Sequence, residues 1–137
     1  MPNTQAIGVA YSDPEFTTMY ASQEIGYSAA AQGSVTQLTS KSTAVTLNKS
    51  AGQITMNNAA LAGNTAASFT LNNSLISAND TIIVCISSIT TGSTAGAYTS
   101  YVSNMTTGSA SITLRNLSGT SYSEAIVINF AVIHCAS

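Results

Sequence analysis

From residue 34 onward, short runs of β-prone residues alternate with short clusters of Gly, Asn, Asp and Ser. Runs of Val, Ile, Thr, Phe and Tyr bounded by such turn residues are typical of β-strands. The pattern therefore predicts an all-β body with eight strands. These strands are Ser34–Leu38, Thr43–Leu47, Gln53–Met56, Ala66–Leu71, Thr81–Ile89, Tyr98–Met105, Ala110–Arg115 and Glu124–His134.

Most of these predicted strands have one apolar and one polar face. Val45 and Leu47 alternate with polar residues, as do Phe69 and Leu71. Because successive side chains of a strand point to opposite faces, one face can be buried while the other meets water. Eight short strands at this spacing predict a sandwich or a barrel. We expect residues 34–137 to form an antiparallel, jelly-roll-like β-sandwich.

Two predicted strands, Thr81–Ile89 and Glu124–His134, are apolar on both faces. A strand of this kind needs cover on both sides, and a lone sandwich covers only one. A neighbouring subunit is the simplest source of the second cover. We therefore predict that Ile83, Val127 and Ile133 lie at a subunit interface. The alternative is that these strands are central to a barrel and are covered by the amino-terminal part of the chain.

Residues 1–33 differ in composition from the rest and are expected to form an extended amino-terminal arm. They hold three of the five acidic residues, both prolines and three of the six tyrosines. Apolar groups in such an arm need a surface, and addition to a sheet edge is one way to obtain it. The alternative is a disordered leader. The candidate contact residues of the arm are Ile7, Val9, Tyr11, Phe16, Tyr20 and Tyr27.

Charged residues make up only 6% of the chain, where about 25% is usual. Polarity comes instead from 21 Ser, 19 Thr and 11 Asn. Such a surface can be buried against a partner at low cost, because few ions must lose their water. A low net charge also does little to keep molecules apart. The composition favours an oligomer or a component of a larger assembly.

The three fixed cations, Lys41, Lys49 and Arg115, are too few to bind nucleic acid, and the net charge is −2. We interpret Lys41 and Lys49, which flank one predicted strand, as solvated strand ends. No stretch approaches the roughly 18–20 apolar residues of a membrane span. The amino terminus lacks the basic and apolar regions of a signal peptide, so we expect synthesis in a cytoplasm without export by the usual route.

The residues that could carry chemistry are sparse. His134, the single histidine, adjoins Cys135, but neighbouring strand residues point to opposite faces and cannot form a nucleophile–base pair. We expect a hydrogen-bonded histidine at a strand end, with no obvious acid to orient it. Asp80 follows Asn79 in a predicted turn and is expected to cap it. Cys85 and Cys135 are expected to be reduced and buried, with a disulfide as the alternative.

The titratable groups therefore predict no catalytic, cofactor-binding or metal-binding residues. Asp80 and Glu124 are the only acids of the body, and a catalytic carboxylate pair is the less favoured interpretation. No phosphate-binding glycine loop, nucleophile elbow or calcium loop is present in the sequence. We expect a protein that is not an enzyme.

Six segments of the body are distinctive as a series and weak one by one. They are Ser34–Gln37, Thr39–Lys49, Gly52–Met56, Ala67–Leu71, Asp80–Val84 and Asn129–Ile133. Together these segments, which cover roughly residues 34–133, resemble small virion proteins of tailed bacteriophages.

This resemblance implies a β-sandwich on the surface of a virion, most similar to head decoration (cement) proteins. Such proteins bind as trimers where capsid subunits meet, so the implied partners are the major capsid protein and further copies of this chain. Similar domains also occur on tail proteins. The alternative is therefore a receptor-binding domain of a tail fibre or tip, for which a loop such as Thr90–Ala97 would be suited. The family has no catalytic motif whose residues could be carried over.

Overall fold

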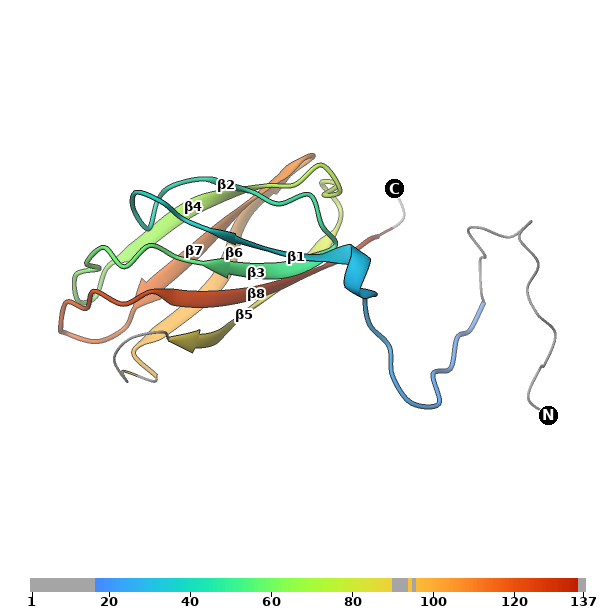
Figure 1. Cartoon of the computed structure of the whole chain (residues 1–137), viewed down its shortest axis with the longest axis horizontal. Coiled ribbons are helices and arrows are strands. Elements are labelled where there is room, and N and C mark those ends of the chain that lie inside the picture. The colour runs from blue at the N-terminus through green and yellow to red at the C-terminus, as the bar shows by residue number, and fades with distance from the viewer. Residues whose placement is uncertain (1–16, 90–93, 95, 136–137) are drawn as a thin grey trace.

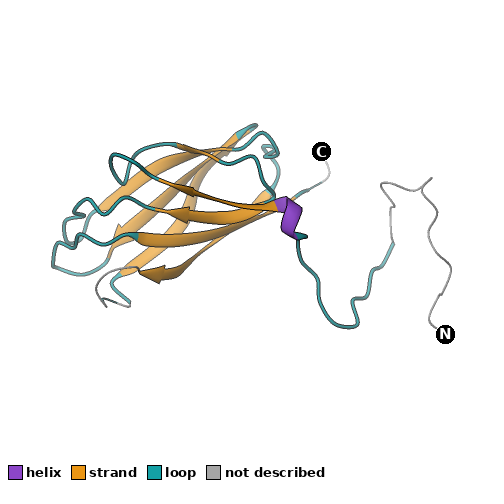
Figure 2. Ribbon diagram, viewed as in Figure 1, coloured by secondary structure: helices purple, strands orange, loops and turns teal. Residues whose placement is uncertain are grey.

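The computed structural model describes residues 17–89, 94 and 96–135. They form two four-stranded β-sheets packed face to face, with a single 3-10 turn, η1 (Ala29–Ala31), before the first strand (Figures 1 and 2). The strands are β1 (Gln32–Thr36), β2 (Val45–Thr46), β3 (Ala51–Thr55), β4 (Ala66–Asn72), β5 (Thr81–Ile89), β6 (Tyr98–Thr106), β7 (Ser109–Asn116) and β8 (Ile126–Ile133).

All eight strands predicted from the sequence pattern are present, which confirms the all-β, sandwich-like prediction. Strand β5 has the predicted bounds. Strand β1 is shifted two residues toward the amino terminus, and β2 keeps only two residues of the predicted Thr43–Leu47. The carbonyl of Thr43 accepts a hydrogen bond from the Gln37 side chain, so at this residue the backbone bonds to a side chain instead of to a neighbouring strand.

Strand direction differs from the antiparallel arrangement that we expected. Sheet A has the order β1-β3-β8-β5 and sheet B the order β2-β4-β7-β6, and the edge pairs β1–β3 and β2–β4 are parallel. The first four strands alternate between the sheets, so the chain returns to each sheet in its original direction. The intervening strand serves as the crossover that a parallel pair requires. The structure thus shows two packed mixed sheets and does not confirm a jelly-roll-like topology.

The hydrophobic core lies between the two sheets, where the inward-facing residues of every strand meet. Register aligns the inner residues in rows, and Ile128 of β8 lies between Ile54 of β3 and Ile86 of β5. Burial of each large aliphatic side chain contributes about 1.5–3 kcal/mol. The fully enclosed aliphatic residues are Ile54, Leu71, Ile112, Leu114, Ile126, Ile128 and Val132.

Residues 17–31 of the arm lie outside both sheets. Strand β1 begins at Gln32, one residue before the predicted end of the arm. Residues 17–28 contain no strand and lead away from the sandwich (Figure 1). Tyr20 is 93% exposed, whereas Tyr27 is partly covered and its hydroxyl donates a hydrogen bond to the carbonyl of Val132 in β8. The other candidate arm contacts, Ile7, Val9, Tyr11 and Phe16, lie outside the described residues.

Candidate interaction surface

The outer face of sheet A carries exposed aliphatic side chains. Ile83 of β5 lies opposite Ala131 of β8, which in turn lies opposite Ala51 of β3. Ile133 lies opposite Thr81, one diagonal step from Ile83. Ile83 is 54% exposed and Ile133 is 49% exposed. Two of the three residues predicted at a subunit interface therefore share one accessible face, which we call the sheet A face.

Val127, the third predicted interface residue, is only 5% exposed. Alternation along β8 places it on the same side as Ile133, between Thr55 and Ser88, and it lies outside the main core cluster. Because Val127 is already covered within the monomer, it is not available to a neighbouring subunit. We therefore omit Val127 from the candidate interface and correct that part of the prediction.

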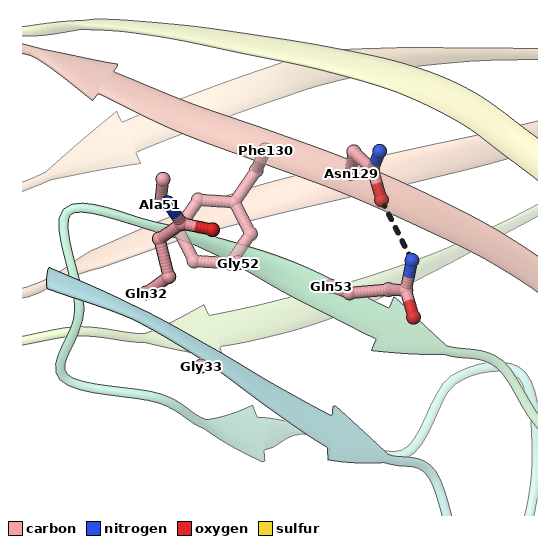
Figure 3. Close-up of a pocket in the computed structure, with 7 residues that line it drawn as sticks. All are labelled: Gln32, Gly33, Ala51, Gly52, Gln53, Asn129 and Phe130. Atoms are coloured by element: carbon pink, nitrogen blue, oxygen red, sulfur yellow. Dashed lines mark hydrogen bonds between the residues drawn. The ribbon is translucent and has the colours of Figure 1, made fainter. Parts of the chain in front are cut away.

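A pocket of about 270 Å³ opens on sheet A, and Figure 3 shows the residues that line it. Its residue Asn129 lies opposite Cys85, one diagonal step from Ile83. Part of the pocket lining is the pair formed by Gly33 of β1 and Gly52 of β3. A Cβ atom at Gly52 would lie 2.7 Å from the carbonyl oxygen of Gly33 and 3.0 Å from Cε1 of Phe130. Glycine is required at position 52 by this close approach. The pocket is lined by Gln32, Gly33, Ala51, Gly52, Gln53, Asn129 and Phe130.

The polar groups of this pocket are uncharged amides. Nε2 of Gln53 donates to Oδ1 of Asn129 at 3.1 Å across the β3–β8 pair (Figure 3). The side chain of Gln32 also lines the pocket and donates through Nε2 to the backbone carbonyl of Tyr27 at the root of the arm. Amides supply both donors and acceptors. The arrangement suits hydrogen bonding to a neutral polar group of a partner and offers no nucleophile.

The outer face of sheet B is different in character, because its side chains are mainly hydroxyls. Oγ of Ser68 lies 2.8 Å from Oγ1 of Thr113, which donates to Oγ of Ser103 at 2.9 Å. Ser103 donates onward to Oγ of Ser111 at 3.2 Å. These hydroxyls satisfy one another, with Thr113 buried among its neighbours. The two outer faces therefore differ, and the aliphatic patch is confined to sheet A.

His134 and Asp80 form a pair at the end of β8, where Nδ1 of His134 lies 2.8 Å from Oδ2 of Asp80. The prediction of a hydrogen-bonded strand-end histidine is confirmed, but the expectation that no acid orients it is wrong. Asp80 also accepts from the N–H of Ser77, as expected for a turn cap, and from the N–H of Cys135. These donors, Ser77 foremost, hold the pKa of Asp80 below its ordinary value, while desolvation opposes them.

This pair does not extend into a catalytic constellation in the described structure. Sγ of Cys135 lies 4.0 Å from Oγ1 of Thr81 rather than at the His134 ring. Cys85 and Cys135 are both free and exposed, so the expectation that they are buried is wrong. Among residues 17–89, 94 and 96–135, no group of three or more His, Cys, Asp and Glu side chains could hold a metal ion.

A second polar cluster is enclosed at one end of the sandwich, around Glu124. Oε2 of Glu124 accepts from the Tyr98 hydroxyl at 2.7 Å and from the Thr94 hydroxyl at 2.5 Å. Nζ of Lys41 donates to the backbone carbonyls of Glu124 at 2.5 Å and Asn57 at 2.6 Å. Lys41 is thus buried, and its interpretation as a solvated strand end is wrong. Burial lowers the pKa of Lys41, and the charge of Glu124 partly opposes this shift.

The hydrogen bonds of the Glu124 cluster explain its role. Burial and the hydrogen bond to Glu124 raise the pKa of Tyr98 above its ordinary value. Among the described residues, every buried side-chain nitrogen and oxygen has a partner. The cluster is therefore a closed internal network that joins Thr94 to the core. Its members come from four separated parts of the chain. The sequence pattern did not predict that these parts lie together.

No helix in the described part of the chain is long and apolar enough to cross a membrane. Lys49, the second predicted strand-end cation, donates through Nζ to the carbonyl of Ala30 in the 3-10 turn at 2.8 Å. Comparison with protein-family models, with curated proteins and with solved structures finds no match for this chain.

Proposed function

We propose that this protein is a structural protein of a tailed-phage virion, without catalytic activity, that binds the outer surface of the capsid as a homotrimer. In this proposal it stabilises the head as a cement or decoration protein, after synthesis in the host cytoplasm. The partners are the major capsid protein and other copies of this chain. Neither nucleic acid nor a membrane is a partner.

The observation that carries the proposal is the exposed aliphatic patch of the sheet A face. Ile83 and Ile133 lie beside a pocket with neutral amides, on a sheet whose other side forms the core. Contiguous apolar surface of this kind is unfavourable in water and is typical of interaction sites. The opposite outer face, with its linked hydroxyls, is suited to remain in solvent.

The arm supplies a second apolar surface. Met19, Tyr20 and Ile25 are all exposed although they are large and apolar. Contact with a capsid would bury these residues at little cost in desolvation of charged groups, because only Glu24 is charged within residues 17–31. Stable protein interfaces bury at least roughly 1,200 Å² in total. The arm and the sheet A face together extend the area that one small subunit can offer.

The hydrogen bonds of Asp80 and Glu124 support the proposal that the protein has no catalytic activity. Asp80 accepts hydrogen bonds from the backbone and from His134, and Glu124 accepts them from Tyr98 and Thr94. Each acid thus holds parts of its own chain together. A catalytic site instead needs such groups to converge on a space that a substrate can enter.

The decisive experiment measures copy number in purified particles of the phage whose genome encodes this chain. Quantitative mass spectrometry should find hundreds of copies per particle, in a fixed ratio to the major capsid protein. A handful or a few dozen copies would instead favour the tail-fibre or receptor-binding alternative. Absence of the protein from particles would overturn both proposals.

A variant pair then tests the surface itself. Ile83→Asp places a charge on the sheet A face, and Thr70→Asp places the same charge on the outer face of sheet B. Both residues are exposed, so both variants should fold. We expect only Ile83→Asp to lose binding to purified heads that lack the protein, measured by co-sedimentation. Equal binding of the two variants would exclude the sheet A face as the contact.

A further inference from the structure

Strand β5 forms a long edge of sheet A. Within the described residues it pairs only with β8. Charged residues and prolines commonly protect a sheet edge from pairing with another strand. The nine residues of β5 include neither. The opposite side of the sandwich is closed by shorter edges, five residues in β1 and two in β2. A register shift between Ile86 and Ser88 leaves Thr81–Ile86 as the regular part of the β5 edge.

Backbone direction shows which groups of β5 face this edge. The N–H of Val132 bonds to Ser50, and the carbonyl of Ile126 accepts from Met56, so even-numbered residues of β8 direct their backbone groups toward β3. Odd-numbered residues of β8 then bond to Thr81, Ile83 and Cys85 in β5. Because antiparallel strands alternate in this way, the remaining residues of Thr81–Ile86 point their N–H and C=O groups outward. These residues are Ile82, Val84 and Ile86.

The side chains of the same residues are incompletely covered. Ile82, Val84 and Ile86 face the core but are only partly buried. Their partners in β8, Val132, Phe130 and Ile128, are almost fully buried. The core therefore ends at the β5 edge. An added strand with apolar side chains on its inner face would cover these residues and bond to the backbone groups beside them.

The arm contains a segment that fits this edge. In Ala6-Ile7-Gly8-Val9-Ala10-Tyr11, the large apolar residues alternate with Ala and Gly, and no residue is charged. In a strand, Ile7, Val9 and Tyr11 would share one face and the small residues the other. In the added strand, the face with Ile7, Val9 and Tyr11 would cover the partly buried core residues of β5. The face with Ala6, Gly8 and Ala10 would lie on the same side of the sheet as Ile83 and Cys85. Edge strand β6 is a poorer match, because its outer face carries Tyr101 and Asn104.

We propose that residues 6–11 of one copy add as a strand to the β5 edge of a second copy. The arm joins its own sandwich at β1, the opposite edge of sheet A, and its described part leads away from the body (Figure 1). Exchange of arms around a closed ring would link the copies of a homotrimer. This inference rests on the self-association included in the proposed function, and it does not require the capsid.

Native Cys85 provides a direct test in the full-length chain. In a Cys135→Ser background, single cysteines replace each of residues 6–11 in turn, and each variant is oxidised with copper phenanthroline. The Cα atoms of directly opposed cross-strand residues are about 4.5–5.5 Å apart, within the Cα range that a disulfide spans. We expect disulfide-linked oligomers on non-reducing gels from at least one of positions 6, 8 and 10, at several-fold higher yield than from positions 7, 9 and 11.

The possible outcomes separate the proposals. A crosslink within a single chain would overturn the exchange between copies, because the arm would then pair with its own β5. A trimer by native mass spectrometry that forms no crosslink at any of the six positions would overturn strand addition and leave self-association standing. A monomer by native mass would overturn both.

Discussion

The carboxylate of Asp80 lies 2.8 Å from Nδ1 of His134, and this contact joins the turn before β5 to the end of β8. The two residues are 54 positions apart in the sequence. Asp80 is nearly enclosed while the His134 side chain is about half exposed. The pair therefore closes one end of sheet A, next to Ile133 on the sheet A face.

Stability should decline in acid through Asp80. Its hydrogen bonds lower its pKa in the native state below the ordinary value of 3.8, so on acidification the unfolded chain takes up the proton first. The contribution is complete above the ordinary pKa and is lost as the pH falls through the lowered native value. The urea concentration at the midpoint of unfolding should therefore change less between pH 2 and pH 7 in Asp80→Asn than in the wild type. Identical pH profiles would contradict this role.

Removal of one hydroxyl should show that the Glu124 cluster contributes to stability. Tyr98→Phe deletes the donor to the Glu124 carboxylate, and hydrogen bonds to charged groups are worth about 1.5–3 kcal/mol. The matched control is Tyr101→Phe, which removes the same atom from an exposed residue of the same strand and should change stability by less than about 0.5 kcal/mol. Equal denaturant midpoints for the two variants would show that the cluster is not a stabilising network.

Substitution of Gly52 should be destabilising for steric reasons. In Gly52→Ala the new Cβ meets the Gly33 carbonyl and the Phe130 ring, and overpacking of this kind costs about 1–3 kcal/mol. In Gly119→Ala no heavy atom lies within 4 Å of the new Cβ, so stability should be unchanged or slightly raised. Thermal unfolding followed by circular dichroism compares the two. If Gly52→Ala were as stable as the wild type, the close approach of β1 and β3 would not be as described.

Burial separates Val127 from Ile133, although both had been predicted at an interface. Val127→Ala should lower the stability of the monomer by about 2 kcal/mol, because it empties covered space. Ile133→Ala should leave the monomer nearly unchanged, within about 0.5 kcal/mol, while weakening self-association. Denaturation and native mass spectrometry on the same samples measure both effects. Loss of self-association in Val127→Ala without loss of stability would restore Val127 to the interface.

The position of each strand could be read from the sequence because strand formation leaves a local signature. Alternation in segments such as Phe69–Leu71 and turn residues such as Asn79 and Gly108 depend only on neighbours along the chain. The doubly apolar pattern of β5 and β8 likewise placed Ile83 and Ile133 on an accessible face. The glycines within β1 and β3 were a local signal of close backbone approach, and that signal was missed in the sequence.

Features that join distant segments were decided only by the tertiary structure. The parallel pairing of β1 with β3, the burial of Lys41 beside Glu124 and the orientation of His134 by Asp80 each bring together residues remote in sequence. Alternation specifies which face a residue occupies, but it does not specify which strand lies beside it or what covers that face. Val127 and Ile133 illustrate this limit, since they share one side of β8 and differ in exposure only because packing covers one of them.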